Sequence, residues 1–217
     1  MIVTIDGPAG TGKSTVARLL AQRLGFEFLN TGAMYRAVAL VCVERAISVE
    51  DHAAVAAIPP TLTMLFRENR LLLDGRDVSE AIRTTSVTEV ASRVASNPRV
   101  RDHLVELQRR AADQVNLVTE GRDQGTIVFP HAECKFFLTA SPEIRAERRL
   151  AELIAQGQDC SLEEILADQT ERDRRDEQRA CAPLRPAEDA VVIDSSSDPI
   201  EKVLARMETI VRSRHFV

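Results

Sequence analysis

Short apolar runs recur along the chain and alternate with longer segments whose apolar residues have helical spacing. Runs of four or five apolar residues, many of them β-branched or aromatic, are typical of strands buried on both faces. The segments between them are long enough for the crossovers that parallel strands require. The pattern predicts an α/β domain of three layers with a five-stranded parallel sheet. Its core strands are expected at 2–5, 26–29, 116–119, 135–139 and 190–194.

One segment departs from this alternation in the first half of the chain. Residues 61–66 alternate in strand fashion, 71–73 can pair back on them, and a polar turn at 67–70 would join the two. A hairpin inside a strand–helix chain predicts a small inserted lobe, which we place at 61–109. Another helix is expected to begin at Thr31, which would be its N-cap. Further helices of this half are expected at 48–58, 84–95 and 98–115.

A second departure is a charged helical arm at about 148–182. Gly157 ends its first helix, which begins at Ser141-Pro142, and Ser161 with Glu164 resembles a capping box that opens the next. A final amphipathic helix is expected at 200–211. The predicted organisation is therefore a core that carries one inserted lobe and one helical arm, with the core made of 1–60 and 110–217.

Between the first strand and the first helix stands Gly7-Pro8-Ala9-Gly10-Thr11-Gly12-Lys13-Ser14, which matches G-x-x-x-x-G-K-[ST]. We call this segment the phosphate loop. Its glycines let backbone N–H groups turn toward a phosphate, and the helix that starts near Thr15 adds a partial positive charge. Lys13 can reach the β- and γ-phosphates, and the Ser14 hydroxyl can coordinate Mg²⁺. A chance glycine-rich turn is the alternative, but a strand before and a helix after the loop favour a nucleoside triphosphate site.

Composition and charge exclude several other classes. The formal net charge is −5, which argues against a general nucleic-acid binder. No apolar run approaches the roughly 20 residues that span a bilayer, and the first strand starts too early for a signal peptide, so a cytoplasmic protein is expected. The cysteines are scattered, as expected for buried free thiols rather than metal ligands; they are Cys42, Cys134, Cys160 and Cys181.

Polar residues follow two further strands at the edge where open parallel sheets bind ligands. Thr31 to Arg36 follows the second strand, and Arg36 is either a clamp for an acceptor phosphate or a solvated surface arginine. Glu120 to Thr126 follows the third, with charged residues beside glycine. Both segments are therefore candidates for binding a phosphate acceptor.

Of the 28 basic residues only three are lysine, and seven arginines gather on the predicted arm helices. Phosphoryl transfer depends on positioning and charge neutralisation, so arginines that close over a γ-phosphate favour a phosphotransferase. A GTPase would need an Asn-Lys-x-Asp element, and the sequence has no Asn-Lys dipeptide. Ion pairs with acidic neighbours on solvated helix faces are the alternative for each single arginine. The seven are Arg145, Arg148, Arg149, Arg172, Arg174, Arg175 and Arg179.

Five blocks of the sequence carry a resemblance to a known family. They are Gly7 to Ser14, Thr31-Gly32-x-x-Tyr35-Arg36, Gly121-Arg122-Asp123-x-Gly125-Thr126-x-Val128-Phe129-Pro130, Glu171-Arg172-Asp173-x-Arg175-Asp176 and Ala182-Pro183-Leu184. Together they resemble bacterial cytidylate kinases of the P-loop nucleoside monophosphate kinase family, and the resemblance runs nearly end to end. Two departures stand out: Glu120, where the family more often has aspartate, and Gln124, where it usually has an aliphatic residue.

The resemblance implies direct in-line transfer of the γ-phosphate of Mg²⁺–ATP to CMP or dCMP. It makes the inserted lobe the acceptor-binding domain and the arm at 148–182 a closing lid. Gly7 to Thr15 would bind ATP, Ser14 would bind Mg²⁺, and charge would be neutralised by Lys13, Arg122, Arg148, Arg149, Arg172 and Arg174. The acceptor phosphate would contact Thr31, Arg36, Arg122, Arg172 and Arg179. The cytosine would contact Ser92, Arg101 and Asp123, and the sugar would lie near Asp176.

The resemblance implies small-molecule nucleotides as partners, and we expect a monomer. The charge and the lack of a long apolar run give no reason to expect a nucleic acid or a membrane as partner. Two rivals stay open: a kinase that uses AMP or UMP, and a regulatory nucleotide-binding protein that transfers no phosphate. The acceptor residues favour a kinase, since a simple switch has no use for them. They include Asp123, whose carboxylate can accept a hydrogen bond from the cytosine amino group.

Overall fold

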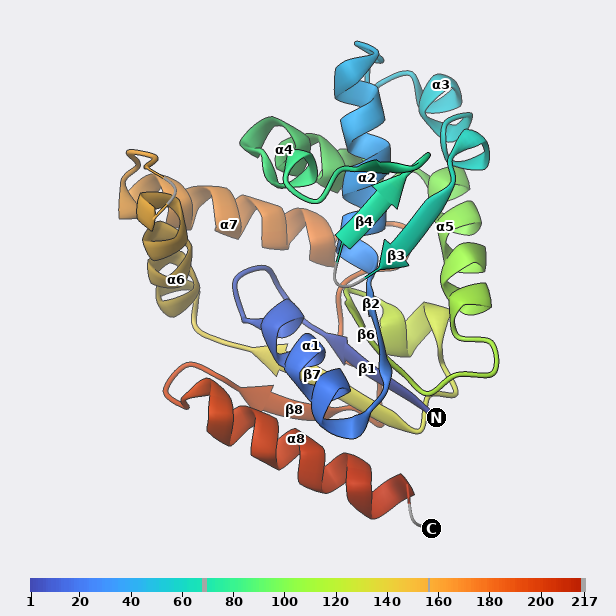
Figure 1. Ribbon diagram of the computed structural model, residues 1–217. Helices are drawn as coiled ribbons and strands as arrows, with labels where there is room; N and C mark the ends of the chain where they lie inside the picture. The colour runs from blue at the N-terminus through green and yellow to red at the C-terminus, as the bar shows by residue number, and fades with distance from the viewer. Residues whose placement is uncertain (68–69, 156, 216–217) are drawn as a thin grey trace. The chain divides into compact units, whose positions relative to one another are not determined.

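The computed structural model describes residues 1–67, 70–155 and 157–215, and the chain forms two compact units (Figure 1). The first unit comprises Met1–Phe28 and Gln114–Val217, and the second comprises Leu29–Asp113. The predicted lobe at 61–109 falls within the second unit. That unit starts earlier than the lobe because the helix after the second strand packs against helices of the lobe.

The sheet of the α/β core has the strand order β2-β6-β1-β7-β8. Strand β1 pairs in parallel with β6 and with β7, and β7 pairs in parallel with β8. The predicted five-stranded parallel sheet is confirmed, and each strand boundary lies within two residues of its expected place. The strands are β1 (Ile2–Asp6), β2 (Glu27–Asn30), β6 (Leu117–Gly121), β7 (Cys134–Thr139) and β8 (Val191–Asp194).

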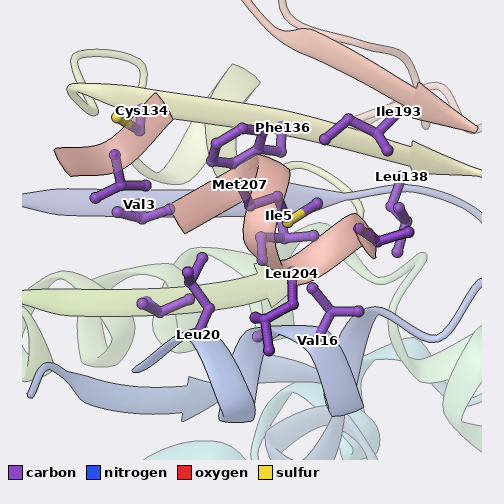
Figure 2. Close-up of a cluster of buried hydrophobic side chains, with 14 of the residues drawn as sticks. Val3, Ile5, Val16, Leu20, Cys134, Phe136, Leu138, Ile193, Leu204 and Met207 are labelled. Carbon is purple, nitrogen blue, oxygen red and sulfur yellow. The ribbon is translucent and has the colours of Figure 1, made fainter. Parts of the chain in front are cut away.

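One face of this sheet is covered by α1 (Lys13–Leu24) and α8 (Ile200–His215), which also pack against each other. Figure 2 shows side chains of both helices around Ile5 and Phe136. Burial of these apolar groups is the main favourable term that holds α1 on the sheet. It thereby fixes both ends of the phosphate loop, which joins β1 to α1.

The face of the sheet opposite α1 and α8 carries polar side chains. Thr4 and Thr119 lie on this face, since successive side chains of a strand point to opposite faces and Val3, Ile5 and Val118 lie in the core on the α1 side. A single π-helical turn, η3 (Gln124–Val128), packs against β1 and β6 here. The hydroxyl of Thr119 donates to Oε1 of Gln124 at 3.0 Å. The departure at Gln124 therefore places a hydrogen-bonding group at a buried position.

The predicted arm is a helical hairpin of α6 (Pro142–Ala155) and α7 (Leu162–Glu177) (Figure 1). The two helices pack through Ala146, Leu153 and Ile165. The capping box is confirmed: the N–H of Glu164 donates to Oγ of Ser161 at 3.2 Å, and the N–H of Ser161 donates to the Glu164 carboxylate at 3.1 Å.

The second unit combines helices with a three-stranded antiparallel sheet of order β3-β4-β5. The predicted hairpin is confirmed, but residues 68–69 of its turn lie outside the described residues. The third strand was not predicted, since two residues carry no alternation pattern. The elements are α2 (Thr31–Glu44), α3 (His52–Ala56), η1 (Pro59–Thr61), β3 (Met64–Arg67), β4 (Arg70–Leu73), β5 (Arg76–Asp77), η2 (Ala81–Arg83), α4 (Thr85–Val94) and α5 (Pro98–Ala111).

Several sequence-based expectations need correction. The helix expected at 48–58 is only α3 at His52–Ala56, because Asp51 caps its N-terminus. The N-cap of α2 is Asn30, whose side chain accepts the N–H of Ala33 at 3.0 Å, while Thr31 is already helical. Helix α5 ends at Ala111 rather than at 115, and Gln114 after it has a φ of 59°, which is incompatible with a continuing helix. Cys181 is exposed and Cys160 is only partly buried, although both were expected to be buried. No described helix combines the length and the apolar character needed to cross a membrane.

Candidate nucleotide-binding site

The phosphate loop begins where β1 ends and passes close to β7. Gly7 has a φ of 146°, and a Cβ atom at this position would lie 2.0 Å from the carbonyl oxygen of Leu138. Only glycine fits so near another strand with this backbone conformation. Gly12, at a φ of 87°, is the N-cap of α1. The loop therefore brings backbone N–H groups to a helix N-terminus, which is an anion-binding arrangement.

Lys13 lies inside this loop, with its side-chain ammonium donating to the carbonyl of Pro8 at 2.6 Å. The residue is only 5% exposed. Burial, and next the positive charge of Arg122, lower the pKa of Lys13 to about 7. A buried ammonium is stabilised by a negative charge beside it, so this side chain fits a phosphate group that enters the loop.

Ser14 and Glu120 meet at the first turn of α1. The Ser14 hydroxyl donates to Oε1 of Glu120 at 2.8 Å, and Glu120 is buried near the end of β6. Among the described residues, no cluster of three or more His, Cys, Asp and Glu could hold a metal by itself. A nucleotide-bound Mg²⁺ needs only one or two protein oxygens, however, and these two oxygen donors fit that requirement. The longer side chain at Glu120 still reaches Ser14.

Asp6 is a buried carboxylate that the sequence did not single out. It accepts the backbone N–H of Gln124 at 2.9 Å and that of Gly125 at 2.8 Å. Burial raises the pKa of Asp6 to about 7 even though these two N–H groups favour its charged form. An acidic residue at the end of a strand, directly before the phosphate loop, was the available signal for it.

A cluster of charges joins the end of β6 to α7. Arg122 donates through Nε to Asp176 at 2.8 Å, and Arg179 also pairs with Asp176, which is 1% exposed. Burial by itself would raise the pKa of Asp176, but the positive charges of Arg122 and Arg179 hold it below its usual range. The structure thus brings two of the predicted phosphate-binding arginines together, and Arg172 is near enough to act on the same carboxylate.

Arg145 of the arm touches the phosphate loop, although the sequence gave it no specific role. It donates to the carbonyl of Ala9 at 3.1 Å and pairs with Asp173 of α7 at 2.6 Å. A third bond, from Nε to the carbonyl of Ala140, measures 3.1 Å. Helix α7 is therefore tied to the loop through one buried guanidinium.

Arg148, Arg149 and Arg174 have other partners. Arg148 donates to Ser195 in the segment after β8, with Nη1 3.1 Å from its hydroxyl. Arg149 pairs with Glu152 at 3.1 Å, and Arg174 pairs with Glu171 at 2.8 Å, each along its own helix. The pairs of Arg149 and Arg174 are the ion pairs along a helix that the sequence left as the alternative, whereas Arg148 bonds a buried serine. A phosphate contact by Arg148, Arg149 or Arg174 stays a prediction.

The remaining predicted residues belong to the second unit. The guanidinium of Arg101 lies over the Tyr35 ring at 5.7 Å from its centroid, and its Nη1 donates to the carbonyl of Ala95 at 3.4 Å. Ser92 is buried on α4, about one turn before Ala95. Helix α2 carries buried Thr31 in its first turn and also Arg36. The motif signalled Tyr35, but the sequence assigned it no contact.

A phosphate loop between a parallel strand and a buried helix defines a P-loop α/β nucleotide-binding protein. A solved shikimate kinase from Bacteroides thetaiotaomicron has a similar fold, with a TM-score of 0.51, 13% identity and 98% of each chain covered. A family model described as cytidylate kinase matches residues 3–213. The chain belongs to the cytidylate kinase family and is a kinase.

Curated relatives agree with this assignment over nearly all of their length. A cytidylate kinase from Geobacter sulfurreducens is 47% identical over 218 residues, which covers 99% of this chain and 94% of the relative. A cytidylate kinase from Carboxydothermus hydrogenoformans is 44% identical over 221 residues and covers 100% of both chains. The family that the sequence motifs indicated is therefore confirmed.

Proposed function

We propose that this protein transfers the γ-phosphate of ATP to CMP or dCMP, giving ADP and CDP or dCDP, in pyrimidine nucleotide metabolism. The observation that carries this proposal is the first unit's combination of a buried Lys13 in a phosphate loop with the Arg122–Asp176–Arg179 cluster. The loop provides for the donor phosphates and the cluster for an acceptor phosphate. Membership of the cytidylate kinase family supports cytosine as the acceptor base.

In this mechanism the loop N–H groups and Lys13 hold the β- and γ-phosphates of ATP. The acceptor phosphate binds Arg122, Arg172 and Arg179. Its oxygens replace the Asp176 carboxylate as the partners of these arginines. Positioning and charge neutralisation then allow direct in-line attack without a covalent enzyme intermediate. Bound Mg²⁺ would supply further charge neutralisation at the β- and γ-phosphates, held by Ser14 with Glu120 beside it.

For the acceptor, Thr31 and Arg36 would add phosphate contacts, and Asp176 would face the sugar once its arginines turn to the phosphate. Asp123, Arg101 and Ser92 would read the cytosine edge, where a carboxylate can accept from the amino group that distinguishes cytosine from uracil. The arm at 148–182 would act as the lid and exclude water. These roles need no residue of a second chain, so we propose a monomer. The cytoplasmic location expected from the sequence stays part of the proposal.

The first test measures ADP release from Mg²⁺–ATP with CMP, dCMP, UMP, AMP or no acceptor. We expect turnover with CMP and dCMP well above the other reactions. Turnover with AMP or UMP instead would keep phosphoryl transfer but overturn the assignment of cytosine. Equal ADP release with every acceptor and with none would mean that the protein is an ATPase or a switch.

Replacing Asp123 by alanine tests base recognition. A site that hydrogen-bonds one base rejects its analogues strongly, and the loss of this match should lower kcat/KM for CMP by at least about 10²-fold. The KM for ATP should change by less than about threefold, since the donor does not contact the cytosine-reading group. Steady-state kinetics with each substrate varied in turn would check this. An equal loss for both substrates would mean that Asp123 does not read the base.

A further inference from the structure

The carboxylate of Asp6 links the phosphate loop to the segment that follows Asp123. Asp6 is the last residue of β1 and directly precedes Gly7. Its Oδ1 accepts the N–H of Gln124 at 2.9 Å, and its Oδ2 accepts the N–H of Gly125 at 2.8 Å. Both oxygens are therefore bonded to consecutive backbone groups of η3, and the residue is only 4% exposed.

Close packing fixes the same segment from a second side. A Cβ atom on Gly125 would lie 2.9 Å from Oγ1 of Thr4 and 3.3 Å from the side chain of Lys135. Thr4 is fully buried, and in the described ranges its hydroxyl has no hydrogen-bond partner. The start of η3 thus packs directly on β1, held by the Asp6 hydrogen bonds and by the contact with Thr4.

We propose that Asp6 is a positioning residue that sets Arg122 and Asp123 relative to the phosphate loop. The residue bonded to its Oδ1 is the immediate neighbour of Asp123, so any movement of that N–H moves the base-reading carboxylate. Displacements of about 1 Å in a reacting geometry can cost on the order of 10²-fold in rate. The inference rests on the proposed roles of Arg122 and Asp123 at the acceptor.

A purely structural role is the alternative, because any buried carboxylate with two hydrogen bonds contributes to folding. The two roles differ in what they affect. Loss of a structural bond would impair the use of ATP and CMP alike, or only lower the melting temperature. Loss of a positioning bond would act on the acceptor more than on the donor.

Asp6→Asn is the direct test, since the amide nitrogen cannot accept one of the two N–H bonds. We expect faster hydrogen exchange at the amides of Gln124 and Gly125 without any nucleotide present. We also expect kcat/KM for CMP to fall at least tenfold, with less than a threefold change in the KM for ATP. Unchanged exchange, or a KM for ATP that rises as much as the KM for CMP, would overturn the proposal.

A second pair of variants reaches the same segment without touching Asp6. Gly125→Ala should displace η3 from β1 and lower kcat/KM for CMP at least tenfold. Thr4→Ala removes the obstructing hydroxyl and breaks no hydrogen bond among the described residues, so this single variant should retain nearly wild-type kinetics. The double variant should recover most of the loss. Full activity of Gly125→Ala, or no recovery in the double variant, would contradict the proposal.

Asp123→Ala separates this inference from the proposed function. If Asp6 acts through Asp123, adding Asp6→Asn to Asp123→Ala should cause no further loss of selectivity for CMP over UMP. A further loss would show that Asp6 acts by another route and would overturn this inference. If Asp123→Ala itself keeps full selectivity, base reading by Asp123 fails. The exchange rates and the KM for CMP of Asp6→Asn then decide whether Asp6 positions Arg122.

Discussion

Lys13→Met is expected to lower kcat by about 10³-fold or more. The ammonium of Lys13 lies within the phosphate loop, where it would neutralise the charge that shifts between the phosphates during transfer. Methionine keeps most of the length of the side chain but carries no charge. Turnover with ATP and CMP at saturating concentrations would measure the loss. Wild-type kcat in this variant would contradict the proposed role of the loop.

The same substitution should stabilise the protein without nucleotide at neutral pH. The folded-state pKa of Lys13 is about 7, against 10.5 ordinarily, so the unfolded chain binds more protons between these values. The contribution of this group to wild-type stability therefore rises with pH across that window. The advantage of Lys13→Met should be on the order of a few kcal/mol below pH 7 and should shrink toward pH 10. Urea unfolding at several pH values checks this.

Lys202→Met is a matched control for both measurements. Lys202 is an exposed lysine on α8 that pairs with Asp198 at 2.7 Å. Because surface pairs contribute little, this variant should keep wild-type turnover and a nearly unchanged free energy of unfolding. A pH-dependent stability difference of equal size in both variants would show that burial of Lys13 is not its cause.

Gly7→Ala is expected to remove both the loop geometry and much of the stability. The added Cβ would lie 2.0 Å from the backbone oxygen of Leu138, and φ is 146°. Neither the loop nor the interior strand β7 can move away without disturbing the buried core. We expect a loss of about 3 kcal/mol or more in the free energy of unfolding and of at least about 10²-fold in kcat/KM. Chemical unfolding and steady-state kinetics would measure the two effects.

Gly25→Ala separates backbone strain from the clash. Gly25 also has a positive φ, of 68°, but a Cβ there would meet nothing within 4 Å. It lies after the last turn of α1, at the opposite end of that helix from the loop. This variant should lose only about 1 kcal/mol and keep its activity. Equal losses in the two variants would show that the contact with Leu138 adds nothing.

Periodicity and local motifs in the sequence were sufficient for most of the core fold. The strand–loop–helix unit around Lys13, the parallel sheet and the capping box at Ser161 follow from short-range patterns, and each has its expected place. Errors occurred where two local signals competed. Asn30 and Thr31 are both good N-caps, and only the start of α2 selects Asn30. Strand β5 is too short to leave a pattern.

The family, the phosphate loop and the candidate residues of the site were thus determined by the sequence itself, because each depends on neighbouring residues. Only the tertiary structure decided which side chains and backbone groups these residues bond to. Asp6 bonds to residues 118 and 119 positions away, and Arg122 pairs with Asp176 54 positions away. Parallel strands bring distant segments to one edge of the sheet. Charged residues that are buried there need a partner, because an unpaired buried charge costs free energy. No local pattern encodes such pairs, since they exist only after the sheet has formed.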